Sequence, residues 1–177
     1  MGKGAALETG LIYAGRARRW VFLDADLINL TEEHIRTLLH PLERDENVGM
    51  TVGRFVEGKT KVVDWAQRFV SILNGQRALS DSFVQSIPGI SWSRFGVEVF
   101  LSNFARHAGI AVEEPLLAGL THYTKEQKMG LAPGIAARLN MFGECLRSAA
   151  IWRRYVGEPK LTDLEPERCE IVRGAVS

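Results

Sequence analysis

The sequence has few of the features that mark secreted, membrane-spanning or nucleic-acid-binding proteins. Its two cysteines, Cys145 and Cys169, are far apart and match no metal or redox spacing. No apolar run approaches the roughly 20 residues that span a bilayer, and no signal peptide follows the first methionine. The formal net charge of +1 lacks the basic excess of nucleic-acid-binding proteins. We therefore expect a cytoplasmic protein with reduced thiols, no transmembrane segment and no nucleic-acid partner.

The composition is that of an ordinary globular protein. Hydrophobic residues make up 46% of the 177 residues and charged residues 24%. This length is sufficient for one domain with a substantial core. We expect that domain over residues 1–156, followed by a mixed C-terminal tail over residues 157–177 that is poorly ordered.

The spacing of apolar residues predicts alternating helices and strands. Helices are expected over Gly4–Ala14, Thr31–Leu42, Val62–Ala78, Val97–Ala108 and Ile135–Val156. Strands are expected over Trp20–Leu23, Val48–Phe55 and Ile110–Leu117, whereas Thr121–Gly134 shows no strong periodicity. This order favours an α/β layered fold. The last helix is amphipathic, with one apolar side formed by Leu139, Phe142, Leu146, Ala149 and Ala150.

The most informative segment is Trp20–Leu27, where a short apolar strand ends in two aspartates, Asp24 and Asp26. Residues two apart on an extended chain point to the same side, so the two carboxylates converge. Converging like charges are costly unless a cation lies between them. A divalent cation prefers oxygen ligands and retains positions for a phosphate. The pattern predicts metal-assisted chemistry on a phosphorylated substrate, although a simple polar strand end remains an alternative.

Several further segments, taken together and in order, resemble one enzyme family. They are Gly2–Leu7, Phe22–Leu27, Gly75–Ala78, Gly96–Glu98 and Thr121–Lys125. The chain from Gly2 to about Val156 is similar to family 2 glycosyltransferases with the GT-A fold. Within that family it most resembles glucosyl-3-phosphoglycerate synthases and polyprenyl-phosphate sugar transferases. The resemblance implies a partial GT-A sheet, Rossmann-like and flanked by helices, with the long amphipathic helix at its C-terminal end.

The resemblance implies a metal-dependent donor site. It places Asp26 on a Mn²⁺ or Mg²⁺ ion, with His122 completing the metal site. It places Lys3, Asp24 and Gln76 beside a UDP- or GDP-linked sugar donor. Mn²⁺ tolerates mixed oxygen and nitrogen ligands better than Mg²⁺ does.

The resemblance also implies two catalytic residues, Glu98 and Arg77, near the transferred sugar and the acceptor. The acceptor would be a phosphorylated small molecule or a lipid phosphate. Each residue also has an ordinary explanation. Glu98 favours the dipole of its helix in any protein. Arg77 is then a surface ion-pair residue and His122 a surface histidine.

Members of this family carry two or three strands before the helix that starts at Gly2-Lys3-Gly4, and these strands hold the nucleotide. The present sequence begins where that segment should end. A shortened product, a misplaced start codon and a gene fragment are all open explanations. We expect uncovered apolar faces and therefore a homo-oligomer, with Ile135–Val156 as the interface element.

Two other functions stay open. The chain is either an inert glycosyltransferase fragment that acts as an oligomeric interaction subunit, or a magnesium-dependent phosphatase of the haloacid dehalogenase type. The phosphatases also use two aspartates at a strand end, but they usually carry threonine where this sequence has Ile28. That difference disfavours the phosphatase hypothesis.

Overall fold

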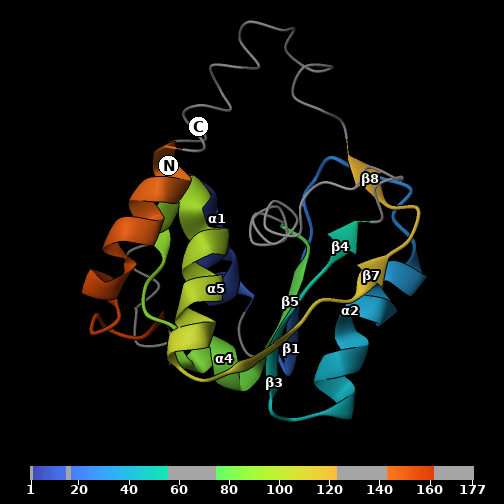
Figure 1. The fold of residues 1–177 in the computed structure, drawn as a ribbon, viewed down its shortest axis with the longest axis horizontal. Coiled ribbons are helices and arrows are strands. Elements are labelled where there is room, and N and C mark those ends of the chain that lie inside the picture. Colours follow the sequence, from blue (N-terminus) through green and yellow to red (C-terminus); the bar gives the residue numbers. More distant parts are fainter. Residues whose placement is uncertain (1, 15–16, 56–74, 123–142, 162–177) are drawn as a thin grey trace, which may run out of the picture.

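A computed structural model describes residues 2–14, 17–55, 75–122 and 143–161. In these ranges the chain forms a central sheet with helices on both sides (Figure 1). The α/β layered fold predicted from the sequence is therefore confirmed. Within the described ranges, no helix has both the length and the apolar content that a membrane crossing requires.

The central sheet has four strands in the order β1 (Arg19–Phe22), β5 (Arg77–Ser80), β3 (Val48–Val52) and β6 (Ala111–Glu113). Strand β5 runs antiparallel to both of its neighbours, and β6 runs parallel to β3. The start of β5 therefore lies at the same sheet edge as the carboxyl ends of β1, β3 and β6. The register shows this directly, because Arg77 is paired with Phe22 on one side and with Val52 on the other.

Two small strand pairs extend the fold. Strand β2 (Leu27–Ile28) pairs antiparallel with β8 (Thr121–His122), and β4 (Arg54–Phe55) pairs parallel with β7 (Leu116–Leu117). Both pairs lie toward the same end of the molecule (Figure 1). The predicted strands Val48–Phe55 and Ile110–Leu117 are each confirmed but divided in two, the second at Glu114 and Pro115.

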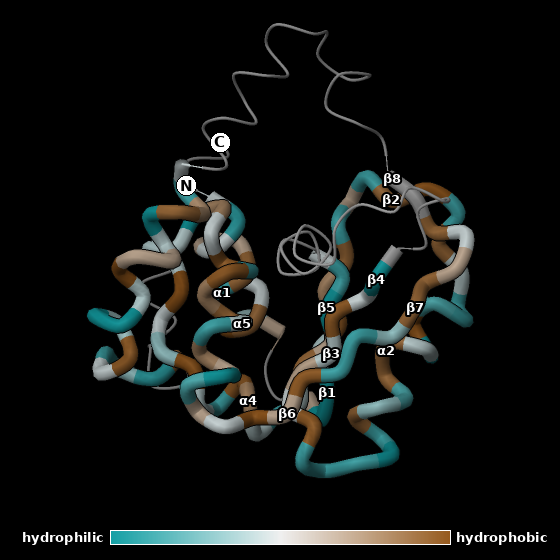
Figure 2. Tube along the Cα trace, viewed as in Figure 1, coloured by the Kyte–Doolittle hydropathy of each residue, from teal (hydrophilic) through white to brown (hydrophobic). Residues whose placement is uncertain are grey.

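Helix α2 (Glu32–Arg44) covers one side of the sheet. Thr31 is its N-cap, and the Thr31 backbone N–H donates to Nδ1 of His34 at 3.1 Å. The core on this side consists of Leu38, Leu42, Val48, Ala78, Leu117 and Leu120. Hydrophobic residues follow the central strands, whereas the turn between α2 and β3 is hydrophilic (Figure 2).

The other side is covered by α1 (Lys3–Tyr13), α4 (Asp81–Ser86) and α5 (Val97–His107), with the 3₁₀ turn η1 (Ser91–Gly96) leading into α5. The predicted helices at α1 and α5 are confirmed. Gly109 follows α5 with a φ of 68°, a conformation that glycine adopts without steric cost. The larger core cluster lies here and includes Leu79, Phe83, Ile87, Phe100 and Phe104.

The predicted helix Val62–Ala78 is wrong at its C-terminal end. Residues 62–74 lie outside the described ranges, but Arg77–Ser80 forms β5 in the middle of the sheet. Arg77, Ala78 and Leu79 are all buried, so the strand shows no alternation of apolar and polar residues. Apolar spacing alone cannot separate such a short buried strand from the end of a helix.

The predicted helix Ile135–Val156 is observed only in part. Residues 143–151 are helical and are followed by the 3₁₀ turn η2 (Trp152–Tyr155), while residues 135–142 lie outside the described ranges. The described residues of its predicted apolar side, Leu146, Ala149 and Ala150, are all exposed, and Leu146 is 63% exposed. The buried residues are instead Cys145 and Ser148. The buried side of this helix contains Ser148, so it does not stand out as an apolar stripe in the sequence.

The division of the chain at residue 156 stays a prediction, but the expected disorder of the tail is wrong for its first residues. Leu161 is 2% exposed and belongs to the larger core cluster. Its backbone N–H donates to the carbonyl oxygen of Ile87 at 2.9 Å, and Lys160 forms a bridge to Pro88. The remaining residues, 162–177, lie outside the described ranges.

Candidate functional site

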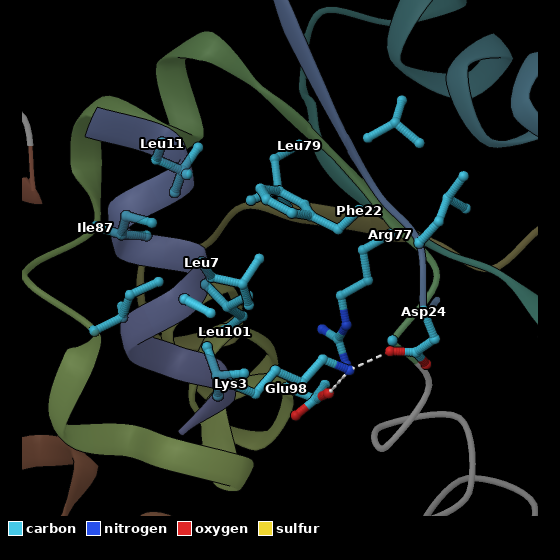
Figure 3. A pocket seen from close by; sticks show the side chains of 17 residues that line it. Lys3, Leu7, Leu11, Phe22, Asp24, Arg77, Leu79, Ile87, Glu98 and Leu101 are labelled. Carbon is cyan, nitrogen blue, oxygen red and sulfur yellow. Dashed lines mark hydrogen bonds and ion pairs between the residues drawn. The ribbon is translucent and has the colours of Figure 1, made fainter. Parts of the chain in front are cut away.

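An ammonium group held between two carboxylates forms the centre of the site. Lys3 Nζ lies 2.5 Å from Asp24 Oδ1 and 2.6 Å from Glu98 Oε1 (Figure 3). The Glu98 side chain is only 8% exposed, whereas those of Lys3 and Asp24 are about one-third exposed, at 29% and 32%. The arrangement therefore opens to solvent on the Lys3 and Asp24 side.

Three separate elements bring these residues together. Lys3 is the first residue of α1, Asp24 follows β1 by two residues, and Glu98 lies in the first turn of α5. The positive end of the α5 dipole favours a carboxylate at Glu98. Asp24 is 21 residues after Lys3 in the sequence, and Glu98 is 74 residues after Asp24. They meet at one sheet edge because α1 and α5 both begin near the carboxyl end of β1.

The ion pairs change the protonation of Lys3. Burial alone lowers the pKa of the ammonium group, but the neighbouring Glu98 and Asp24 carboxylates outweigh that effect and raise the pKa above its ordinary value of 10.5. Lys3 is therefore fully cationic at neutral pH. It supplies a fixed positive charge beside two carboxylates.

Gly75 and Gln76, the two residues before β5, support the Asp24 carboxylate. Gln76 Nε2 donates to Asp24 Oδ2 at 3.0 Å. A side chain at Gly75 would place its Cβ 2.3 Å from Asp24 Oδ2, so only glycine fits beside the carboxylate. Gln76 is 1% exposed, and its buried Oε1 has no hydrogen-bond partner among the described residues.

Arg77 is a buried cation beneath this cluster. Its side chain is 2% exposed, and its guanidinium donates to Ser102 Oγ at 3.0 Å. Burial lowers the pKa of Arg77 to about 10, against the opposing influence of Glu98, Glu114 and Asp24. Arg77 still carries its charge at neutral pH. The alternative in which Arg77 forms an ordinary surface ion pair is therefore wrong.

Ser102 was not identified from the sequence. Its hydroxyl accepts from Arg77 and donates to the backbone carbonyl of Glu98, at 3.0 Å in both cases. It thereby links the buried cation to the start of α5. The available signal was its position four residues after Glu98, which places both residues on one side of a helix.

A cavity of about 350 Å³ adjoins the charged cluster (Figure 3). Lys3, Asp24, Arg77 and Glu98 lie at its polar end. Its other walls are mostly apolar and come from α1, β1, β5 and the region around α5. They include Leu7, Leu11, Phe22, Leu79, Ile87 and Leu101.

The outer edge of β1 borders this cavity. In the part of the chain that the structure describes, β5 is the only strand that pairs with β1. The indole nitrogen of Trp20, on the same strand, is buried and has no hydrogen-bond partner among the described residues.

The structure brings Asp26 and His122 close along the backbone. Strand β2 begins at Leu27, and the β2–β8 register pairs Leu27 with His122. His122 therefore lies opposite the residue that follows Asp26. The described residues contain no group of three or more histidine, cysteine, aspartate or glutamate side chains that could hold a metal ion. The assignment of Asp26 and His122 to a metal ion therefore stays a prediction.

Comparisons with solved structures identify the fold. The chain is similar to glucosyl-3-phosphoglycerate synthase from Mycobacterium tuberculosis in complex with Mn²⁺, UDP-glucose and phosphoglyceric acid, with 23% identity and a TM-score of 0.61. It is also similar to that enzyme with Mg²⁺ and UDP, at 22% identity and a TM-score of 0.61. Each alignment covers 90% of this chain and 56% of the other chain. The chain thus spans little more than half the length of these structures, and the likeness shows the fold alone. Neither a family model nor a curated protein matches the chain.

Proposed function

We propose that the chain carries the metal and acceptor side of a family 2 glycosyltransferase that moves a sugar from a nucleotide-diphosphate donor to a phosphorylated acceptor. The single observation that carries this proposal is the Lys3 ammonium held between Asp24 and Glu98 at the sheet edge. The fold shared with a synthase solved in complex with UDP-glucose and phosphoglyceric acid supports the same function.

Asp26 and His122 are the residues that would hold Mn²⁺ or Mg²⁺ in this proposal. When bound, such an ion supplies positive charge that stabilises a departing diphosphate. Lys3 adds a second positive charge beside the donor. The Gln76 amide donates a hydrogen bond to Asp24, and both residues lie on the side of the site that would hold the ribose of the donor.

Glu98 and Arg77 serve the sugar and the acceptor. The Glu98 carboxylate, 2.6 Å from the Lys3 ammonium, stabilises positive charge that develops on the transferred sugar. Arg77 places a permanent charge below the cluster, where it attracts an acceptor phosphate electrostatically rather than by direct contact. The oxygen of the acceptor hydroxyl forms the new bond to the sugar, the bond from the sugar to the diphosphate breaks, and the hydroxyl proton leaves with the departing diphosphate.

Calorimetric titration of Mn²⁺ with UDP-glucose or GDP-mannose tests the proposal. We expect metal-dependent donor binding by the wild type and its loss in Asp26→Asn, which keeps the side-chain size and removes the charge. Asp45→Asn is the matched control, because Asp45 follows α2 at the opposite end of that helix from β2. The wild type and both variants must melt cooperatively for the comparison to count.

Two results would contradict the proposal. One is donor binding that is equally strong in Asp26→Asn and in the wild type. The other is a folded wild type that binds neither donor at any Mn²⁺ concentration, which would instead favour an inert interaction subunit.

A further inference from the structure

The turn η1 (Ser91–Gly96) adjoins both Lys3 and Glu98, the partners of an ion pair at the site, and its backbone is strained. Arg94, within η1, has φ 50° and ψ −121°, values that residues other than glycine rarely adopt. Such a conformation costs on the order of 1–3 kcal/mol and persists only where surrounding contacts enforce it. Contacts around the turn must therefore hold Arg94 in this conformation.

Glu144, in the C-terminal helical segment, contacts the turn twice. Its Oε1 lies 3.0 Å from Arg94 Nε, and its Oε2 accepts a hydrogen bond from the backbone N–H of Phe95 at 3.2 Å. Four residues further along the helix, Ser148 Oγ donates to the carbonyl oxygen of Ser93 at 3.3 Å. One carboxylate thus binds both the side chain of the strained residue and the amide that follows it.

The same turn supports the start of α1. A Cβ at Gly2 would lie 2.8 Å from Arg94 Cβ, and one at Gly4 would lie 2.4 Å from Ser93 Oγ. Lys3 lies between these two glycines. The backbone that carries the Lys3 ammonium therefore rests directly on the turn that Glu144 holds.

The turn also leads straight into α5. Gly96 ends η1, Val97 begins α5, and Glu98 is the next residue. Gly96 packs against the same helical segment, since a Cβ at this glycine would lie 2.0 Å from Ser148 Oγ. The turn is consequently a shared support for Lys3 and for Glu98, which come from different elements.

We propose that Glu144 is a positioning residue that holds the strained turn Ser91–Gly96 and thereby fixes the separation of Lys3 and Glu98. This inference rests on the proposed function, in which that ion pair forms the catalytic centre. Without the Glu144 carboxylate, Arg94 relaxes toward an ordinary backbone conformation. The surface beneath Gly2 and Gly4 then moves, and Lys3 loses its fixed place beside Glu98.

Reductive methylation of lysines, followed by mass spectrometry of peptides, measures the state of Lys3 without any substrate. An ammonium held by two carboxylates reacts slowly, whereas the exposed Lys160 serves as an internal reference in the same sample. We expect Glu144→Ala to raise the Lys3 rate about fivefold relative to Lys160, the factor that corresponds to the low end of such a strain energy. Glu144→Gln keeps an acceptor for the Phe95 amide and is expected to give a smaller increase.

A second substitution separates positioning from general stability. Glycine adopts the backbone conformation of residue 94 without strain, so Arg94→Gly combined with Glu144→Ala should return the Lys3 rate toward that of the wild type. Glu46→Ala, which removes an exposed carboxylate in the turn between α2 and β3, should leave the rate unchanged. The melting temperature of each variant is recorded in parallel.

An unchanged Lys3 rate in a folded Glu144→Ala variant would overturn the inference. So would a double variant whose Lys3 rate stays as high as that of Glu144→Ala alone. The result is independent of the proposed function, because methylation requires neither metal nor donor. Absence of donor binding by the wild type would overturn the transferase proposal and leave the positioning role of Glu144 standing.

Discussion

The two sides of the central sheet differ in how completely they are packed. On the α2 side, Leu38 and Leu117 are fully buried, and Thr51 Oγ1 donates to the carbonyl oxygen of Leu38 at 2.8 Å. On the α1 side, a cavity of about 350 Å³ separates α1 from the sheet and ends in a cluster of charges. The α2 side is thus closely packed, whereas the α1 side contains a cavity next to a polar site.

This contrast has a physical origin in the sequence of each helix. Helix α2 presents His34, Leu38, Pro41 and Leu42 as one continuous buried side. Helix α1 buries only Gly4 and Leu11, and its contacts are chiefly with η1 rather than with the strands. A helix that packs against a turn leaves the adjacent sheet surface open. Substitutions on the two sides should therefore behave differently.

The largest difference is expected for matched leucines. Leu38→Ala should lower the free energy of unfolding by about 3 kcal/mol, because it creates a new cavity in a closed core. Leu11→Ala should cost only about 1–2 kcal/mol, because Leu11 already borders an existing cavity and makes fewer contacts there. Urea unfolding of both variants measures the difference. Equal losses would show that the two sides are packed alike.

Glycine substitutions sharpen the same comparison. Gly53→Ala should destabilise the protein by about 1–3 kcal/mol, because its Cβ would lie 2.4 Å from Cδ1 of the fully buried Leu117. Gly10→Ala, in α1 at the cavity wall, meets nothing within 4 Å and should stabilise the helix by up to about 1 kcal/mol. Thermal melting gives the sign of each change, and a destabilising Gly10→Ala would contradict an open α1 side.

The buried cation is expected to matter more for binding than for stability. Replacing Arg77 with methionine removes a desolvated charge and preserves much of its volume, so the free energy of unfolding should change by less than about 1 kcal/mol. Donor or acceptor binding should weaken because the electrostatic potential of the site falls. Chemical denaturation and calorimetric titration on one preparation test both parts. A strongly destabilised variant would identify Arg77 as a structural residue.

The smallest effect is a pH dependence on the α1 side. The folded-state pKa of Lys3 is raised above 10.5, so its contribution to stability is fully present below that value and is lost as pH rises through the folded pKa. The difference in unfolding free energy between the wild type and Lys3→Met should be constant from about pH 7 to about pH 9 and shrink above about pH 10.5. Arg77, whose pKa is lowered to about 10, titrates over the same pH range in both proteins. Taking the difference between the two proteins therefore removes its contribution. A difference that grows with alkaline pH would contradict the raised pKa.

Only the acidic strand end was predicted from local pattern, because an apolar strand that ends in Asp24 and Asp26 is a signal within a few residues of sequence. The site roles of Lys3 and Glu98 came from the family resemblance, because a lysine or a glutamate in the first turn of a helix is ordinary in any protein. The structure gathers Lys3, Asp24 and Glu98 as a unit, although nothing in their spacing indicates that the Lys3 ammonium bridges the two carboxylates.

Other features could not be predicted because their signals are not local. Strand β5 is almost wholly buried and shows no periodicity, so Arg77 was expected in a helix rather than at the start of a central strand. Its complete burial likewise depends on its partners, Ser102 and Met50, which lie 25 and 27 residues away. Glu144 gave no signal, because its role depends on a turn that begins about fifty residues earlier.

The sequence by itself determined the alternation of helices and strands, the capped start of α2 and the acidic strand end. Each of these depends on residues that are neighbours along the chain. Only the tertiary structure decided that β5 lies between β1 and β3, that Arg77 is buried, and that Lys3 lies between Asp24 and Glu98. Burial and ion pairing are properties of groups brought together from distant positions, and no local pattern encodes their distances.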